Sequence, residues 1–331
     1  MVAWTLDKRD IRAFAIVATF VTLLAGIGLA LLSRQVVKAK RVSRLLETGS
    51  CDSCDLDGIT LRQADLANTS VHDASLRDVN LAEADMGGIN LAESVLSGAN
   101  LTRANLSGAD LSGAVLSGAV LNEAILIQAD LRGTYIGDAS LVEAILDDAV
   151  LGDAILTRTS LRGAHLGGAN LQRADLGGAD LREARLREAQ MVRINLGDAD
   201  LDGADLFGAD LRRADLRRAS LRRADLRKAN LRDANLSSAN LSKTDLSETN
   251  LSRTFFRETD LSQAVLRGSN LRSAALFQAN LRGADLRETL LQGTNFRRAD
   301  LTDANLEGVD LSSALLCDTQ MPNGAVSDRD C

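Results

Sequence analysis

The chain has 331 residues, a formal net charge of −7 and an aromatic content of 3%. It has only two histidines, His72 and His165, and it lacks a P-loop, a dinucleotide-binding fingerprint and a Ser/His/Asp set, which argues against an enzyme. The scarcity of aromatic side chains argues against a protein that stacks nucleic-acid bases. We therefore expect no catalytic, cofactor-binding or metal-binding residues.

An uncharged segment of twenty residues, 13–32, follows a short N-terminal flank, residues 1–12, that contains Lys8, Arg9 and Arg12. Twenty apolar residues are the length of one membrane span. A cleavable signal peptide is the alternative, but its apolar core is usually only about 7–15 residues long. The sequence therefore predicts a transmembrane helix over residues 13–32.

The residues after this span set its expected orientation. Positive residues tend to stay in the cytoplasm, which predicts a cytoplasmic repeat domain, with the periplasm or the thylakoid lumen as the alternative. We expect residues 33–50 to continue the helix up to Gly49 and to cover the first coil of the next domain, because an open sheet edge needs covering. The apolar residues for this cap are Val42, Leu45 and Leu46, and the basic ones are Arg34, Lys38, Lys40, Arg41 and Arg44.

The four cysteines lie near the two ends of the region that follows, as Cys51 and Cys54 and as Cys317 and Cys331. The spacing of the first pair lacks the helical setting of a redox motif, and a zinc site needs four ligands close together. Cys54 occupies a repeat position that usually carries alanine, which suits a small buried thiol. Disulfides at both ends are the alternative, and they would favour an oxidising compartment and the opposite topology.

The rest of the chain repeats a five-residue unit, in which leucine recurs at every fifth position, alanine stands two residues before it, and Asp or Asn lies between them. From Leu56 to Met321 all 54 of these positions are apolar and 47 are leucine. A period of five fits neither an α-helix nor a flat strand. The exceptions to leucine are Val71, Met86, Ile136, Met191, Phe256, Phe296 and Met321.

The chain must therefore turn once per unit, so that Leu and Ala point inward while the residue between them points outward. One unit cannot fold alone, because ordering five residues costs roughly 5–10 kcal/mol and burying one leucine returns only about 1.5–3 kcal/mol. Stability must come from stacking many units. The pattern predicts an all-β solenoid over residues 51–321.

The A(D/N)LXX pattern of residues 54–321 resembles the pentapeptide-repeat family. The resemblance implies a right-handed quadrilateral β-helix with four units per coil, hence about 13 coils. The opening CDSCDLDG and the C-terminal end resemble membrane-anchored members of cyanobacterial type. Some members of the family mimic B-DNA and modulate type II topoisomerases, which is an alternative function for this chain.

The repeat ends near Met321. The next residue, Pro322, is the only proline and has no N–H for a ladder, and Asn323 and Gly324 are typical of a turn. We expect residues 322–331 to form a short C-terminal tail.

Several outward positions break the polar pattern. With four units per coil, residues twenty apart stack, so four of these positions form one column that continues at Asp175. A stacked apolar stripe is a candidate interface, whereas half-buried sheet positions that favour β-branched residues are the alternative. The stripe comprises Val95, Val115, Tyr135 and Ile155, with Val120, Ile125, Ile145 and Val150 on adjoining sides, and a weaker group in the same column comprises Phe255, Ala275 and Leu315.

Charge is uneven along the repeat. Residues 51–160 carry 17 acidic and 5 basic side chains, and residues 161–300 carry 19 and 24, so opposite halves of neighbouring molecules could attract. The basic side chains concentrate in four consecutive units, which is one coil, so they encircle it as a belt. Nucleic-acid binding is disfavoured by the interleaved aspartates and by the lack of aromatics. The belt comprises Arg212, Arg213, Arg217, Arg218, Arg222, Arg223, Arg227 and Lys228.

These features favour a non-catalytic, membrane-tethered scaffold for protein interaction. Its partner would be an unidentified protein or another copy of the chain, without a cofactor or a small-molecule substrate. The DNA-mimic function is the alternative.

Overall fold

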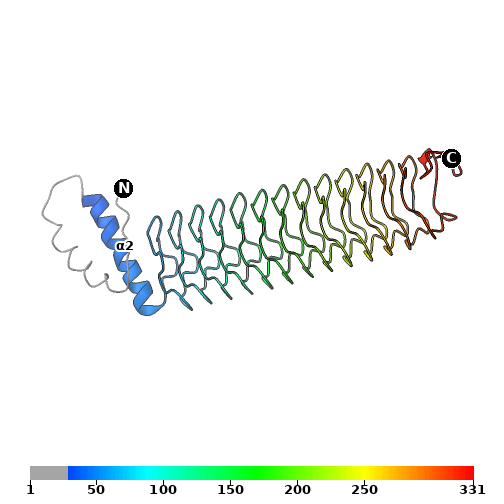
Figure 1. Ribbon diagram of the computed structural model, residues 1–331. Coiled ribbons are helices and arrows are strands. Elements are labelled where there is room, and N and C mark those ends of the chain that lie inside the picture. The colour runs from blue at the N-terminus through cyan, green and yellow to red at the C-terminus, as the bar shows by residue number, and fades with distance from the viewer. Residues whose placement is uncertain (1–28) are drawn as a thin grey trace. The chain divides into compact units, whose positions relative to one another are not determined.

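The computed structural model describes residues 29–331. It contains helix α2 (Leu29–Thr48), a long series of bridged coils, and the short strands β1 (Thr319–Gln320) and β2 (Val326–Ser327) (Figure 1). Most of the predicted transmembrane segment, residues 13–28, lies outside the described residues. Among the helices that are described, none has both the length and the apolar character needed to cross a membrane. The chain divides after Val150 into two compact units.

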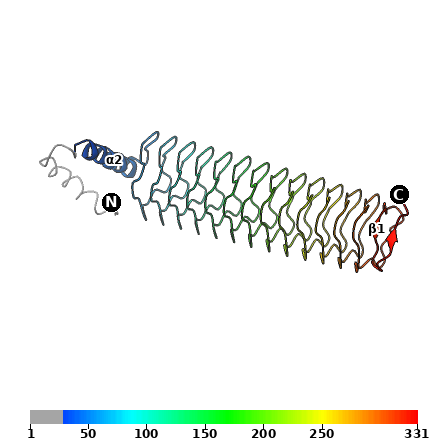
Figure 2. The same ribbon diagram turned by 90° about the horizontal axis from the view of Figure 1, so that it is seen from above.

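In both units the backbone pairs in parallel with the residue twenty positions further along. In the first unit the bridges run from Ser50↔Ser70 to Asp130↔Val150, and in the second from Ile155↔Asp175 to Asp300↔Gln320. Twenty residues are four five-residue units, so each coil has four sides, and successive coils of each unit stack on one another (Figure 2). The predicted solenoid with four units per coil is confirmed.

Each corner is a four-residue turn. The N–H of Ala99 donates to the carbonyl of Leu96 at 3.0 Å, and the third residue of that turn, Gly98, has a φ of +68°. A type II turn requires a positive φ at this position, which explains the recurrence of glycine there. The turn directs Leu96 and Ala99 into the interior, where both are fully buried.

The outward Asp or Asn has a bonding role that the composition alone does not reveal. Its side-chain oxygen accepts the N–H of the residue two positions on, as between Asn100 Oδ1 and Thr102 N (3.1 Å) and between Asp110 Oδ1 and Ser112 N (3.0 Å). This local bond satisfies a corner N–H that the ladder between coils leaves over. Aspartate and asparagine therefore recur at this position because they stabilise the corner.

Helix α2 closes the N-terminal end of the first unit. Val42 and Leu45 are 3% and 1% exposed. Arg41 donates to the Asp55 carbonyl oxygen at 2.8 Å, and Lys38 donates to the Asp57 carbonyl oxygen. These two carbonyls belong to the first coil, which has no preceding coil to pair with, so the helix supplies their hydrogen-bond donors. The helix stops at Thr48, and Gly49 follows with a φ of +71°.

The tail after Met321 folds back onto the last coil. Strands β1 and β2 pair antiparallel, with Thr319 opposite Ser327. Asp330 exchanges two hydrogen bonds with Leu316: its carboxylate accepts the Leu316 N–H at 2.9 Å, and its own N–H donates to the Leu316 carbonyl at 2.8 Å. Arg329 donates to the Leu311 carbonyl at 3.1 Å. The tail therefore provides bonding partners that a further coil would otherwise supply.

The packing of α2 predicts that Leu45→Asp lowers the free energy of unfolding by about 2–4 kcal/mol, because a carboxylate would be buried without a partner. Val37→Asp is the matched control on the same helix, since Val37 is 45% exposed. Thermal unfolding of the two variants checks this, with Leu45→Asp expected to melt well below Val37→Asp. Equal melting temperatures would show that the helix is not a cap.

Candidate interaction surfaces

Three of the apolar departures form one continuous column in the first unit. Val95 bridges Val115, and Val115 bridges Tyr135. Both valines are half-buried, whereas Tyr135 is 51% exposed. The structure therefore brings these three side chains together on one side of the unit.

The other five predicted stripe residues are distributed differently. Ile125 and Ile145 bridge each other on another side of the first unit. Of the remaining three, Val120 bridges Asn100 and Ser140, Val150 bridges Asp130, and Ile155 bridges Asp175 in the second unit. In the weaker group Phe255 bridges Ala275, but Asn295 separates Ala275 from Leu315.

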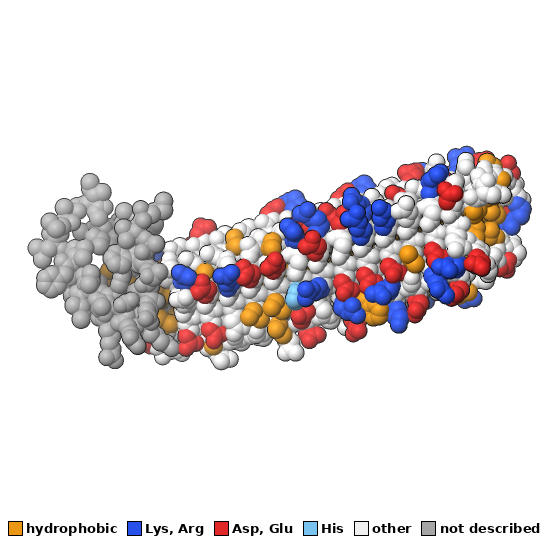
Figure 3. Space-filling view, in the orientation of Figure 1, with side chains coloured by type: hydrophobic (Ala, Val, Ile, Leu, Met, Phe, Trp, Pro, Cys, Tyr) orange, Lys and Arg blue, Asp and Glu red, His pale blue; other side chains and the backbone are white. Residues whose placement is uncertain are grey.

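The basic belt is largely neutralised by neighbouring carboxylates. Arg217 donates through Nε and a terminal nitrogen to Asp215, two residues earlier, and Arg218 binds Asp198 of the preceding coil in the same two-point way. Figure 3 shows basic and acidic side chains interleaved over this part of the surface. Ion pairs engage Arg212, Arg217, Arg218, Arg222, Arg227 and Lys228.

In the part of the chain that the structure describes, Arg213 and Arg223 alone among the belt residues make no ion pair. A surface whose arginines are held by aspartates has few free cations to offer a phosphate backbone. The geometry therefore favours the interpretation of a solvated, internally paired belt over nucleic-acid binding.

The same pairs shift the pKa values of their carboxyl groups. Hydrogen bonds from the Arg217 guanidinium, and then from the Arg217 N–H, hold the pKa of Asp215 below its ordinary value despite partial burial. The pattern recurs at four further corners where arginine stands two residues after aspartate. It lowers the pKa values of Asp130, Asp180, Asp225 and Asp285.

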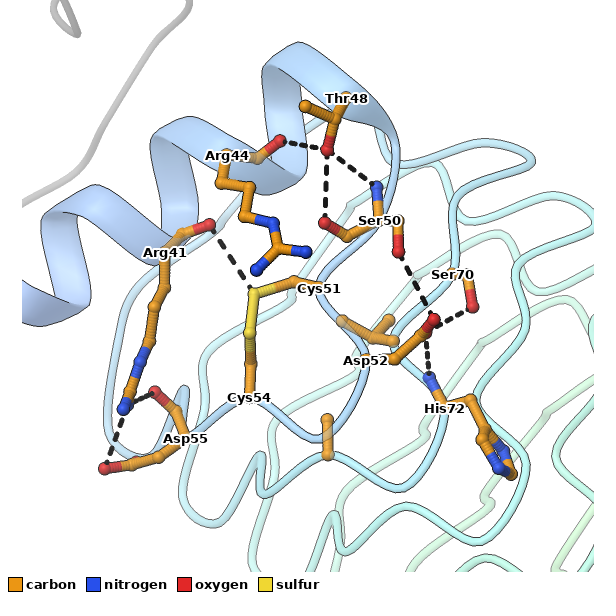
Figure 4. Close-up of a disulfide and its surroundings, with 12 residues drawn as sticks. Arg41, Arg44, Thr48, Ser50, Cys51, Asp52, Cys54, Asp55, Ser70 and His72 are labelled. Atoms are coloured by element: carbon orange, nitrogen blue, oxygen red, sulfur yellow. Dashed lines mark hydrogen bonds and ion pairs between the residues drawn. A yellow bond between two sulfur atoms is a disulfide. The ribbon is translucent and has the colours of Figure 1, made fainter.

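The cysteines form two disulfides, one at each end of the described repeats. Cys51 is bonded to Cys54, with their Cα atoms 5.5 Å apart, beneath helix α2 (Figure 4). Cys317 is bonded to Cys331, with Cα atoms 4.9 Å apart, and this bond ties the tail to the last coil. Of the two interpretations that the sequence left open, buried thiols and disulfides, the structure has the disulfides.

Within the described residues, 29–331, the two histidines belong to different units. His72 is an exposed residue of the first unit, and His165 is a half-buried residue of the second. At the tail, ligand-type atoms of Asp318, Asp328 and Cys331 lie within 4.8 Å of one another. Cys331 is already bonded to Cys317, and Asp328 accepts the Asp318 N–H at 3.1 Å, so this group is engaged in closing the tail.

A four-sided coil built from five-residue units, with leucine and alanine inside, defines a class of β-solenoid. Eight copies of the family described as pentapeptide repeats match segments of the chain between residues 51 and 316. The chain belongs to this family, whose members fold as right-handed quadrilateral β-helices.

Solved structures include similar proteins. A trypsin-treated form of QnrB1, a plasmid-mediated fluoroquinolone resistance protein, is 20% identical over 53% of this chain and 91% of its own, with a TM-score of 0.47. HetL, involved in heterocyst differentiation regulation in the cyanobacterium Nostoc sp. strain PCC 7120, is 29% identical over 86% of this chain and 98% of its own, with a TM-score of 0.23. A pentapeptide repeat protein from the Arabidopsis thaliana thylakoid lumen is 24% identical over 36% of this chain and 68% of its own, with a TM-score of 0.27. No curated protein matches the chain.

The lowered carboxyl pKa values predict a loss of stability in acid. A group whose pKa is lower in the folded state than in the unfolded state stabilises the fold above its unfolded pKa, and this contribution disappears as the pH falls through the folded pKa. The melting temperature should therefore fall as the pH is lowered from about 5 to 3.

The combined substitution Arg182→Gln, Arg217→Gln and Arg227→Gln should flatten this fall, because it removes three of the two-point pairs. Arg213→Gln with Arg223→Gln is the control that removes arginines without ion pairs. If both variants kept the full pH dependence, the arginine–aspartate pairs would not be its cause.

Proposed function

We propose that this chain is a non-catalytic, membrane-tethered scaffold that presents the outer sides of its β-helix to a protein partner. The observation that carries the proposal is the filled interior: the inward leucine and alanine columns of both units are almost fully buried. A ligand has no room inside such coils, so binding must use the outer sides. Those sides are regular sheet surfaces, which suit a protein partner better than a small molecule.

The tether is proposed from the sequence of residues 13–32, which contain no charged side chain. Two basic residues after this segment have a structural task. Lys38 and Arg41 donate to carbonyls of the first coil and lie 3.7 and 3.4 Å from the Asp55 carboxylate. Their presence beside the apolar segment is therefore explained without the positive-inside rule.

The two disulfides favour an oxidising compartment for the repeat domain. Disulfides persist in secreted, periplasmic and lumenal proteins and are rare in the reducing cytosol. All four cysteines of this chain are paired. We therefore favour the periplasm or the thylakoid lumen for the repeat domain over the cytoplasmic location that the positive flank predicts.

The DNA-mimic function is the less favoured alternative. The excess of acidic side chains in residues 51–160 supports it. A tether that holds the chain at a membrane opposes it, as do the ion-paired arginines of the second unit.

The tether predicts that the full chain stays in the membrane pellet after an alkaline carbonate wash. Val17→Arg with Leu24→Arg should move most of it to the supernatant, since each arginine at the centre of a span costs about 2.5–3.5 kcal/mol. Ser237→Arg with Ser242→Arg adds the same charge on the repeat surface and should leave the chain in the pellet. A wild-type chain released by carbonate would contradict the tether.

A repeat domain in the periplasm or the thylakoid lumen predicts that all four cysteines are oxidised in cells. Cells quenched in acid, denatured and treated with a maleimide-linked polymer should show a chain that takes up no label. The same sample reduced first should take up four labels, because the chain has 4 cysteines. Full labelling without prior reduction would place the repeat domain in the cytoplasm.

A further inference from the structure

One corner of the second unit carries a line of arginines. We call it the arginine edge and define it as the corner pairs from 172–173 to 272–273, which recur every twenty residues. Backbone hydrogen bonds stack these corners on one another, as from the Arg193 N–H to the Arg212 carbonyl at 2.9 Å. The exposed basic residues of the edge are Arg173, Arg193, Arg212, Arg213, Arg232, Arg253 and Arg272.

Positive charge is concentrated on this corner. The arginine edge holds seven arginines and a single carboxylate, that of Asp233, which Arg253 binds through two nitrogens at 2.6 and 2.7 Å. The other three corners, which begin at 177–178, 182–183 and 187–188, hold three, five and five basic side chains against two, two and three acidic ones. The edge therefore runs along the unit, whereas the basic belt encircles one coil.

The two sides that adjoin the arginine edge are also poor in carboxylates. Their twelve outward positions, from 170 to 275, contain three aspartates, whereas the twelve on the other two sides, from 180 to 285, contain seven. Seven of the positions that adjoin the edge are instead asparagine or glutamine.

The fold does not require an uncharged amide at these positions. Asp210 Oδ1 accepts the Arg212 N–H at 3.2 Å, and the Asp210 carboxylate also binds the Arg212 guanidinium at 2.8 and 2.6 Å. Asn230 Oδ1 accepts the Arg232 N–H at 3.3 Å, so it makes the same corner bond without a charge. Asparagine therefore keeps the turn and brings no carboxylate to the guanidinium beside it.

Three arginines of the edge have no carboxylate partner. Ion pairs engage the other four, but within the described residues none engages Arg193, Arg213 or Arg272. Arg272 donates instead to the neutral Oε1 of Gln292 at 2.7 Å. Coils are about 4.8 Å apart, and like charges on neighbouring strands destabilise a sheet. Bound negative charge along the edge would remove this repulsion.

We propose that the arginine edge binds the anionic headgroups of a lipid bilayer, so that the second unit lies against the membrane. This inference rests on the proposed function, because the tether holds the edge close to a bilayer and so raises its effective concentration there. Basic side chains close to an anionic bilayer are attracted to its surface.

Shape and an exposed aromatic side chain favour a bilayer over other polyanions. The edge is a convex corner, which can rest along its length on a flat surface, whereas single-stranded nucleic acid is bound in grooves lined by several aromatic side chains. Phe255 lies two residues after Arg253, on a side that adjoins the edge, and leaves 53% of its surface exposed. An aromatic side chain beside basic ones is typical of surfaces that lie at a membrane interface.

The test reconstitutes the full chain into phosphatidylcholine vesicles, with or without about one-third phosphatidylglycerol, and asks which corner contacts lipid. A fluorophore on Ser252→Cys, a residue of the edge, should be quenched by nitroxide-bearing lipids in the anionic vesicles only. Ser262→Cys, at the diagonally opposite corner, is the matched control and should be quenched in neither. The native cysteines are disulfide-bonded and stay unlabelled.

A second measurement does not depend on the tether. Val17→Arg with Leu24→Arg disables the tether, and this chain should still sediment with the anionic vesicles at about 0.05 M salt and be released at about 0.5 M. It should not sediment with pure phosphatidylcholine vesicles.

Two sets of substitutions that remove equal charge are compared in this tether-disabled chain. The first removes the exposed arginines of the edge that have no ion pair and should weaken vesicle binding at least about tenfold. This set is Arg193→Gln, Arg213→Gln and Arg272→Gln. The control removes ion-paired arginines from other corners and should weaken binding less than about threefold. The control set is Arg182→Gln, Arg227→Gln and Arg287→Gln.

The membrane contact is overturned if Ser252→Cys is quenched no more than Ser262→Cys, or if the two sets weaken binding equally. It is also overturned if the tether-disabled chain binds polyglutamate or a single-stranded oligonucleotide more tightly than vesicles with the same number of anionic groups. These outcomes leave the tether standing as long as the full chain remains in the carbonate-washed pellet. Release by carbonate, with salt-sensitive vesicle binding intact, would instead overturn the tether and keep the edge.

Discussion

The backbone ladder between residues twenty positions apart is the constraint on which the rest of this structure depends. Leu96 donates to the Val115 carbonyl at 2.7 Å, and Val115 donates to the Ser94 carbonyl at 2.9 Å, and the same pair of bonds recurs through both units. An inserted residue would shift every later side chain out of register, since leucine would then fall on a corner or an outer position. The unbroken five-residue frame from Leu56 to Met321 follows from this requirement.

The ladder also creates a problem at each end, because a terminal coil has carbonyls and amides without partners. The two ends solve it differently. At the N-terminal end, side chains of an α-helix replace the missing coil, with Lys38 and Arg41 as donors to the Asp55 and Asp57 carbonyls. At the C-terminal end the Asp330 carboxylate accepts the Leu316 N–H, and the Asp330 N–H donates to the Leu316 carbonyl. The Cys317–Cys331 disulfide holds the tail in this position. An exposed sheet edge invites further strand pairing, so both caps also limit uncontrolled end-to-end association.

The inside of the coils could be predicted from the sequence because one rule governs it: Leu and Ala alternate with a residue that must face outward. The outside could not be predicted to the same degree. Arg217 binds Asp215 within its own unit whereas Arg218 binds Asp198 of the preceding coil, and these choices depend on which corner residue has a positive φ and therefore points along the stack. The fold of the tail could not be predicted from the repeat, because the residues after Pro322 do not follow it. The sequence could not decide whether the cysteines are thiols or disulfides, because spacing alone does not distinguish the two.

Because the outward Asp or Asn accepts a hydrogen bond from a corner N–H, an apolar residue at this position has an energetic cost. If that position tolerated any polar residue, an apolar one would signify little. Because the side-chain oxygen binds a corner N–H, every valine, isoleucine or tyrosine there forgoes a local bond and adds apolar surface that water disfavours. A single apolar residue at this position costs only one local bond, and Val120, which lies between Asn100 and Ser140, is such a case. Val95, Val115 and Tyr135 are three in succession, bridged to one another, and they give up three local bonds on a single side of an acidic unit. Such a loss is compatible with a contact that recovers it elsewhere.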